Sequence, residues 1–233
     1  MNFNTQKNDN NFNYKEFVGP VNVYEYHGLL QKELLLCLGL KPYNTVLDVG
    51  CGGLRLGRLL IKYLDSSKYT GIEPMKSVLI QAIQKELDNE IIQIKKPKFL
   101  IYSDFNFRDN NNSLIPIQDF IIAFDVFFHC GKNQLELFLK NLSKISNNKT
   151  KTIVSVMLNN EITNKGIIES NEGTYYYPHA SHRNVLYTIK DFQSIALSFG
   201  FDSNIIKFKK NIISFYDKNL TQSSRIIFLL KKL

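Results

Sequence analysis

The chain has 233 residues and a mass of 27.0 kDa, which is the size of one ordinary globular domain. Its apolar fraction of 44% is sufficient for a packed core, and 17 Phe and 12 Tyr exclude a fully disordered chain. Because the 12 Gly and 6 Pro follow no regular period, collagen-like and coiled-coil chains are excluded as well.

Charge and cysteine content constrain the partners and the compartment. The formal net charge is +8, but the lysines are scattered and no Arg-rich tract accompanies them, which disfavours a nucleic-acid partner. Cys37, Cys51 and Cys130 are widely spaced and odd in number, so we expect neither a disulfide framework nor a metal site. No run approaches the roughly 18 apolar residues of a membrane span, and the N-terminus has no apolar signal core. These features predict a cytoplasmic protein without a membrane span.

Two segments precede the main fold. Residues 1–13 are polar and rich in Asn, and they predict a disordered tail. Residues 14–42 predict an N-terminal helical lid or packing segment, because Val21–Leu40 carries apolar residues at roughly helical spacing. Residues 43–233 follow as a single domain without an internal repeat.

Within that domain, β-rich runs alternate with segments of helical periodicity, and this order predicts a parallel sheet with helices on both faces. The five predicted strands are Thr45–Val49, Tyr69–Glu73, Lys98–Tyr102, Asp119–Phe124 and Thr152–Leu158. Helices are predicted directly after the glycine-rich turn at residues 50–53, over Lys76–Leu87 and over Asn133–Ile145.

The pattern changes after the fifth strand. Residues 159–187 predict a long polar excursion rich in Tyr and His, and a helix is predicted over Ile189–Phe199, before Gly200. Two strand-like runs, 205–216 and 225–231, have no helical segment between them, so we expect them to pair antiparallel at one edge of the sheet.

The segment that indicates a ligand site is the glycine-rich turn after the first strand, DVGCGGLR from Asp48 to Arg55. Such a turn lets backbone N–H groups approach a ligand closely. A dinucleotide fingerprint would need glycine at Arg55, and no P-loop sequence follows. The Asp48 carboxylate would also repel a pyrophosphate, whereas it would attract S-adenosylmethionine (SAM), which carries a sulfonium and an α-ammonium.

Acidic side chains at the ends of the next two predicted strands favour the same ligand. Glu73 lies 23 residues after Gly50, a spacing at which an acidic side chain meets a ribose diol in this architecture. Asp104 and Phe105 close the third strand, where a carboxylate can accept a hydrogen bond from an adenine amino group while the ring packs on the base. The carboxyl ends of parallel strands meet at one edge, so we expect these groups to lie together.

These motifs resemble those of the class I SAM-dependent methyltransferases over residues 43–233: VLDVGCGGLRLG, YTGIEP, SDF, DFIIAFDVFFH and the closing strand pair. The resemblance implies an α/β fold with a Rossmann-like, seven-stranded, mostly parallel sheet whose last strand is antiparallel. It implies that SAM binds across the switch between strands one and four. One departure is that the third glycine of the family's DxGxGxG motif falls on Leu54. The residues predicted to bind the cofactor are Asp48, Gly50, Cys51, Gly52, Gly53, Glu73, Pro74, Asp104, Phe105 and Phe124.

Two residues after the fourth strand are predicted to act in catalysis. An alcohol acceptor needs a base for its proton as the new bond forms. His129 lies at the carboxyl edge of the sheet and imidazole titrates near working pH, so His129 is the predicted base, with a capping or packing role as the alternative. Asp125 interrupts an apolar run and could orient His129 or hold an acceptor hydroxyl, or it could cap the next helix.

Acceptor contacts are predicted in the excursion after the fifth strand, because long loops at strand ends often bind ligands. The residues proposed for this role are Tyr177, His179, His182 and Arg183, with Tyr175 and Tyr176 beside them. Three N-terminal residues could line a lid over the cofactor or pack the helix: Tyr24, His27 and Gln31. Arg55 could pair an acidic acceptor group or form a salt bridge.

The resulting hypothesis is a SAM-dependent O-methyltransferase that acts on a small hydroxylated acceptor. The segments GCGGLR, FDVFFH, HGLLQ and LYT-x-x-DF resemble bacterial small-molecule methyltransferases, several of them associated with surface-polysaccharide sugars, which suggests a sugar or a nucleotide-activated sugar. Alternatives are an RNA-directed or small-amine N-methyltransferase, and a cofactor-binding subunit that has lost catalysis. The [DNS]PP[YF] element of base-amine methyltransferases is absent, since residues 125–128 read DVFF.

Overall fold

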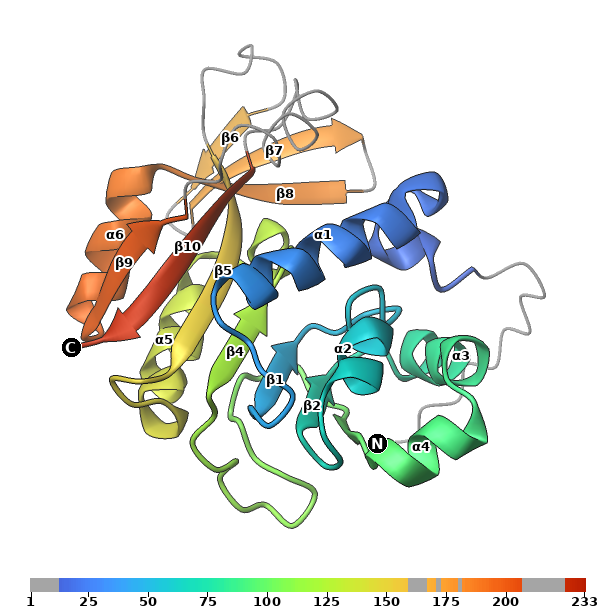
Figure 1. The fold of residues 1–233 in the computed structure, drawn as a ribbon. Coiled ribbons are helices and arrows are strands. Elements are labelled where there is room, and N and C mark those ends of the chain that lie inside the picture. The colour runs from blue at the N-terminus through green and yellow to red at the C-terminus, as the bar shows by residue number, and fades with distance from the viewer. Residues whose placement is uncertain (1–12, 159–166, 171–172, 180–181, 207–224) are drawn as a thin grey trace.

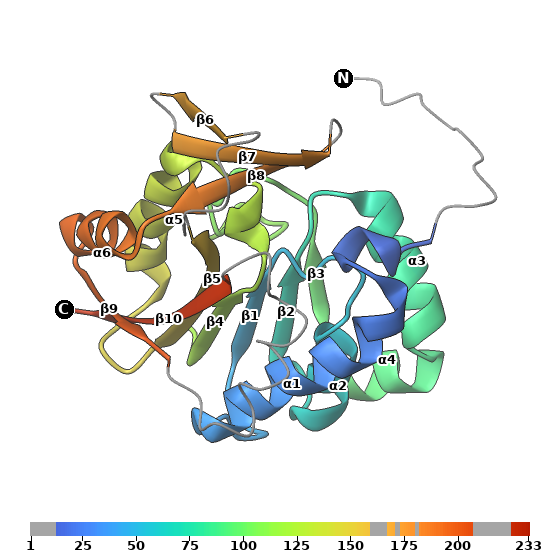
Figure 2. The same ribbon diagram turned by 90° about the horizontal axis from the view of Figure 1, so that it is seen from above.

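The computed structural model describes residues 13–158, 167–170, 173–179, 182–206 and 225–233. Almost all of the predicted N-terminal tail and most of the strand predicted over 205–216 lie outside these residues. The elements form a central sheet covered by helices on both faces (Figures 1 and 2).

The predicted parallel sheet is confirmed. Its strands are β1 (Val46–Val49), β2 (Tyr69–Ile72), β3 (Lys98–Leu100), β4 (Phe120–Ala123) and β5 (Lys151–Leu158), in the spatial order β3-β2-β1-β4-β5. The order reverses direction at β1, because β1 pairs with both β2 and β4. Ligands of open α/β sheets bind at such a switch point, outside the carboxyl ends of the strands.

The predicted antiparallel edge is also confirmed, with one shift along the chain. β10 (Arg225–Lys232) pairs antiparallel with β5 and with β9 (Phe201–Ile205), so seven strands form the sheet that the resemblance implies. β9 begins directly after Gly200, earlier than the strand predicted over 205–216. The left-handed Gly200, at φ 80°, turns the chain from helix into strand there.

The predicted polar excursion over 159–187 is wrong for its described part, which contains three further strands. They are β6 (Ile167–Ser170), β7 (Gly173–His179) and β8 (His182–Tyr187), and they extend the sheet to ten strands. β8 joins β5 in parallel only at the end of β5, where Met157 faces Leu186 and Leu158 faces Tyr187. The Tyr-rich β7 has suitable β propensity, but its strand state depends on pairing with β8 and β6.

The helices form two layers. On one face lie α1 (Tyr24–Cys37), α2 (Gly57–Tyr63), α3 (Lys76–Glu86) and α4 (Asn89–Lys95), and on the other lie α5 (Lys132–Ile145) and α6 (Ile189–Ser198) (Figure 2). The predicted helices are thus confirmed, and α4 is an addition. Within the described part of the chain, none of the helices has the length and apolar character needed to cross a membrane.

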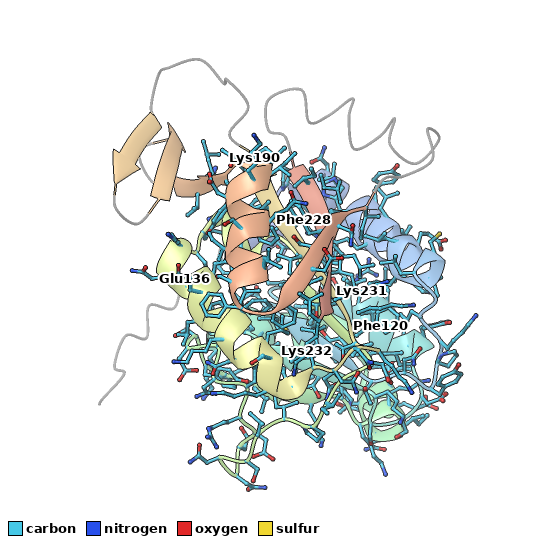
Figure 3. The ribbon with its side chains drawn as sticks, turned by 90° about the vertical axis from the view of Figure 1, so that its left-hand side faces the viewer. Phe120, Glu136, Lys190, Phe228, Lys231 and Lys232 are labelled. Atoms are coloured by element: carbon cyan, nitrogen blue, oxygen red, sulfur yellow. The ribbon has the colours of Figure 1, made fainter. Side chains whose placement is uncertain are left out.

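Alternate side chains along each strand point to opposite faces of the sheet and pack against the two helix layers. Val46 and Ile122 pack toward α1–α4, whereas Leu47 and Ile121 pack toward α5 and α6, as expected for strands buried on both faces. Phe228 of β10 lies beneath α6, where its ring stacks on Phe192 with centroids 4.3 Å apart (Figure 3).

Candidate functional site

A cavity of about 770 Å³ lies at the carboxyl ends of β1, β2 and β4, where the sheet order reverses. This volume is within the range of small-molecule sites. Eight of the residues predicted to bind the cofactor line it: Asp48, Gly50, Cys51, Gly52, Glu73, Pro74, Phe105 and Phe124. The predicted catalytic residues Asp125 and His129 line it as well, whereas Gly53 and Asp104 do not.

The glycine bend, defined here as residues 50–54, has a backbone that requires small residues. Gly50 and Gly52 have φ values of 71° and 51°, which glycine adopts without strain. A Cβ on Gly50 would lie 2.5 Å from Val126 Cγ2, and a Cβ on Gly52 would lie 2.5 Å from Val18 Cγ1. Leu54, which replaces the third glycine of the motif, keeps a left-handed φ of 58°.

Gly53, a predicted cofactor contact, is not among the residues that line the cavity and lies against the N-terminal segment. A Cβ on Gly53 would lie 2.6 Å from the carbonyl O of Tyr14, so this glycine admits the N-terminal segment. That segment continues as the short helix Glu16–Val18, and Phe17 and Val18 line the cavity. The sequence predicted a helical lid in this part of the chain, but gave no signal that its first turn would reach the glycine bend.

Glu73 is held rigidly at the end of β2. The side chain is 3% exposed, and its two carboxylate oxygens accept hydrogen bonds from backbone N–H groups. Gly52 N donates to Oε2 at 2.9 Å and Met75 N donates to Oε1 at 2.8 Å. Burial raises the pKa of Glu73, and these two hydrogen bonds oppose that shift. Each oxygen keeps a lone pair for a ligand hydroxyl.

Asp48 is the second buried carboxylate of the cavity and is 5% exposed. Burial raises its pKa from an ordinary 3.8 to about 7, and the nearby Glu73 carboxylate adds to the shift. A hydrogen bond from Tyr69 Oη to Oδ2, at 2.8 Å, and the charge of Arg55 oppose it. Two acidic groups under a glycine bend make this part of the cavity suited to a cation.

Asp125 adopts a left-handed conformation at the end of β4, with φ 65° and ψ 3°. Its backbone N donates to Ser155 Oγ at 2.7 Å, and the Ser155 hydroxyl donates to Oδ1 at 3.1 Å. Arg55 Nη2 donates to Oδ2 at 2.9 Å, and Arg55 Nη1 donates to the carbonyl O of Val18. The salt-bridge alternative for Arg55 is therefore the one that the structure contains, and Ser155 is a contact that the sequence did not indicate.

His129 follows the short helix η3 (Val126–Phe128) and is exposed at the wall of the cavity. Phe127 anchors that helix in the core, where its ring centroid lies 5.0 Å from that of Phe138. β8 lies beside this turn, because Leu186 packs with Phe128 and Tyr187 Oη donates to the carbonyl O of Cys130 at 3.0 Å. His129 thus lines the cavity from a turn whose neighbouring residues contact β8.

Asp104 is not brought into the cavity. Its carboxylate is exposed and accepts hydrogen bonds from Asn106, from the backbone N at 3.2 Å and from Nδ2 at 2.7 Å. Phe105, in contrast, is buried and lines the cavity together with Tyr102 and Ser103. Phe105 itself has a left-handed φ of 49°.

The remaining predicted contacts divide between the helix α1 and the added strands. Gln31 lines the cavity, whereas Tyr24 and His27 do not; Tyr24 Oη donates to the carbonyl O of Gly53 at 2.7 Å. The predicted acceptor contacts lie on two strands, Tyr177 and His179 on β7 and His182 and Arg183 on β8. Their side chains lie outside the described part of the structure.

Sequence comparison finds no matching protein-family model and no matching curated protein. Solved structures do match in fold. One is a protein from Pyrococcus horikoshii OT3, with a TM-score of 0.66 and 15% identity over 94% of this chain and 95% of that one. Another is the magnesium protoporphyrin IX methyltransferase of Synechocystis PCC 6803 with bound S-adenosylhomocysteine (SAH), at a TM-score of 0.59 and 15% identity over 91% and 87% of the two chains.

A third match is a glycopeptide N-methyltransferase complexed with SAM, at a TM-score of 0.61 and 11% identity over 88% and 94% of the two chains. The chain has the fold of these two methyltransferases, which were crystallised with SAH and with SAM. At this level of identity the likeness concerns the arrangement of the elements. The chemistry of this chain depends on the side chains of its cavity.

Proposed function

We propose that the protein is a SAM-dependent methyltransferase. The observation that carries this proposal is the pair of buried carboxylates, Asp48 and Glu73, beneath a glycine bend at the switch point of the sheet. In this role Glu73 would bind the ribose hydroxyls, because its oxygens are fixed and keep free lone pairs. Asp48 would lie near the ammonium group, and the backbone of Gly50 to Gly52, which lines the cavity, near the methionine portion.

The charge of the cavity favours this cofactor over a phosphate-bearing one. A pyrophosphate at the bend would face Asp48 and Glu73, whose pKa values are already raised by burial. A positively charged ligand instead stabilises the ionised form of both groups. The adenine base would lie near Phe105 and Phe124, both of which line the cavity; no carboxylate from Asp104 is part of that wall.

When bound, SAM would supply an activated methyl group: an acceptor nucleophile would attack the methyl carbon in line with the carbon–sulfur bond, which breaks to release SAH. The protein has to align the acceptor and exclude water. For a hydroxyl acceptor, the proton leaves the oxygen as the carbon–oxygen bond forms, and His129 at the cavity wall would accept it. Asp125 is held by Arg55 and Ser155, so it would support this turn rather than take the proton.

The proposed acceptor is a small hydroxylated molecule, a sugar or a nucleotide-activated sugar of a bacterial surface polysaccharide. Phe128, which follows Asp125 and also lines the cavity, provides an apolar surface against which a sugar can pack. The net charge of +8 favours a phosphorylated acceptor by general attraction. The sequence resemblance to sugar-directed enzymes supports the same acceptor class.

A labelled-methyl transfer screen tests the proposal. Purified protein is incubated with methyl-labelled SAM and, in separate arms, with nucleotide sugars, small amines and RNA. Transfer to a nucleotide sugar that persists in alkali, as an ether does, supports O-methylation. Label on an amine or on RNA overturns the acceptor class and leaves the methyltransferase proposal intact, while failure to bind SAH overturns both.

A further inference from the structure

Arg55 joins two walls of the cavity that come from distant parts of the chain. Its Nη1 donates to the carbonyl O of Val18, in the N-terminal segment of residues 14–19. Its Nη2 donates to Asp125 Oδ2 at 2.9 Å, at the end of β4. All three residues line the cavity. The guanidinium therefore connects the N-terminal segment to the turn that carries the proposed base.

The backbone of Arg55 is held in place by a close contact with α1. A Cβ on Gly28 would lie 2.4 Å from the carbonyl O of Arg55, so a larger residue would push this loop away. The Arg55 side chain extends from this fixed point and is 9% exposed. Because its backbone and both Nη groups are held, the guanidinium has little freedom to follow one partner away from the other.

Stability alone does not explain a buried arginine at this position. Its Nε is buried and, within the described ranges of the chain, has no hydrogen-bond partner. Burying a guanidinium is costly, and a buried ion pair often adds little net stability over apolar side chains of similar volume. The shape of the guanidinium does explain it, because this rigid planar group donates in two fixed directions at once.

The Asp125 end of this connection reaches the proposed base through one short helix. Asp125 precedes η3 and His129 follows it, and His129 N donates to the carbonyl O of Val126 at 3.1 Å. Phe127 is fully buried in the core and limits how far η3 can shift. Loss of the Arg55 contact would therefore tilt the turn, and a small misplacement of a catalytic group is enough to slow a reaction.

We propose that Arg55 is a positioning residue for methyl transfer, which holds the turn that carries His129 in a fixed position against the N-terminal segment. The inference rests on the proposed function and adds to it a residue that affects turnover without touching the reacting atoms. It predicts that the two walls are coupled, so that a change at Asp125 alters the N-terminal segment through Arg55.

Hydrogen exchange in the full chain tests this coupling without an acceptor. Asp125→Asn removes the carboxylate charge and keeps a residue type that tolerates the left-handed backbone. We expect the amides of residues 14–19 to exchange about 10-fold faster in this variant, since the guanidinium loses the charged partner that orients it. Arg55→Lys, which keeps the charge but not the planar fork, should have the same effect. Lys62→Met, at an exposed position of α2, is the matched control and should exchange as the wild type does.

Turnover separates a positioning role from a purely structural one. In Arg55→Lys we expect kcat with the acceptor found in the screen to fall about 10-fold, while the Kd of SAH stays within about 2-fold. The double variant Arg55→Met/Asp125→Asn removes both buried charges together, so its Tm is not expected to fall. Its turnover should nevertheless stay about 10-fold below that of the wild type, because the connection is still missing.

Three outcomes would overturn the inference alone, in a wild-type protein that binds SAH. They are unchanged exchange of residues 14–19 in Asp125→Asn, wild-type turnover in Arg55→Lys, and turnover in the double variant that simply follows Tm. A wild-type protein that binds no SAH overturns the proposed function itself, and the inference with it. Calorimetry with SAH distinguishes the two cases.

Discussion

The two halves of the cavity are built in different ways. In the half around the glycine bend, Glu73 is fixed by the N–H groups of Met75, two residues away, and of Gly52, 21 residues away. In the half around η3, Asp125 is fixed by Arg55, 70 residues away, and by Ser155, 30 residues away. The first half therefore depends on backbone geometry near the strand ends, and the second on side chains that packing brings together.

This contrast predicts that changes in one half affect binding and changes in the other affect turnover. The largest effect is expected for His129→Ala, which removes the proposed base. We expect kcat to fall about 100- to 10,000-fold with SAH affinity unchanged. Single-turnover methyl transfer to the acceptor found in the screen, measured with SAH binding, checks this. An unaffected rate would remove His129 as the base.

The next largest effect is expected in the first half of the cavity. Glu73→Ala removes a buried carboxylate and leaves two backbone N–H groups without their acceptor. We expect the Kd of SAH to rise about 100-fold, from the loss of charge-assisted hydrogen bonds. Calorimetry measures it, with Glu90→Ala on the exposed side of α4 as the control. Full affinity in Glu73→Ala would mean that the nucleoside binds elsewhere.

The pH dependence of stability provides a test of Asp48, in the same half of the cavity. Its folded pKa, about 7, is raised above 3.8, so the stability it contributes is fully present below about pH 4 and is lost as pH rises through 7. The wild-type protein without ligand should therefore lose stability over this window relative to Asp48→Asn, by on the order of 2–4 kcal/mol. Urea unfolding at pH 4 and pH 8 measures the difference.

Ionisation of Asp48, which lowers the stability of the unliganded protein, should increase its affinity for the cofactor. If the ionised Asp48 attracts the ammonium, SAH affinity rises as pH approaches 7 from below, by up to about 10-fold per pH unit. Asp48→Asn should show a flat profile over that range. Equal pH profiles for the two proteins would contradict the assignment.

The smallest effect is expected for Ser155→Ala in the second half. This change removes the hydroxyl that accepts from the Asp125 N–H and donates to Oδ1, while Arg55 still binds Oδ2, and so loosens the left-handed turn that precedes His129. We expect turnover to fall about 10-fold, with SAH affinity within about 2-fold. Ser203→Ala, at a buried serine on β9, is the control for generic loss of a hydroxyl. A change in SAH affinity as large as that in turnover would mean that the two halves are not separable.

Much of the fold was predictable because its signals are local. Apolar runs such as that of β4 and the periodicity of α5 lie within one segment each, and their alternation determines a parallel sheet. The strands β6–β8 were missed, since polar and aromatic residues in a long connection do not distinguish a loop from strands that form only by pairing.

In the candidate site, too, sequence spacing predicted the position of some residues and not of others. Spacing predicted that Asp48, Gly50, Gly52 and Glu73 would meet, because the carboxyl ends of neighbouring parallel strands must share an edge. Spacing also suggested Asp104, but that carboxylate is exposed and accepts hydrogen bonds from Asn106 instead. A motif places the Cα atoms, and the local dihedral angles decide where each side chain goes.

By itself, then, the amino-acid order determined the parallel strands β1–β5, the switch point, the glycine bend and its two acidic neighbours, since each follows from periodicity or from short spacing. Only the tertiary structure decided that Arg55 pairs with Asp125, that Ser155 holds the turn before His129, and that Gln31 faces the cavity. Those contacts join segments that are far apart in the chain, and their energy depends on burial and distance, which exist only once the layers have packed.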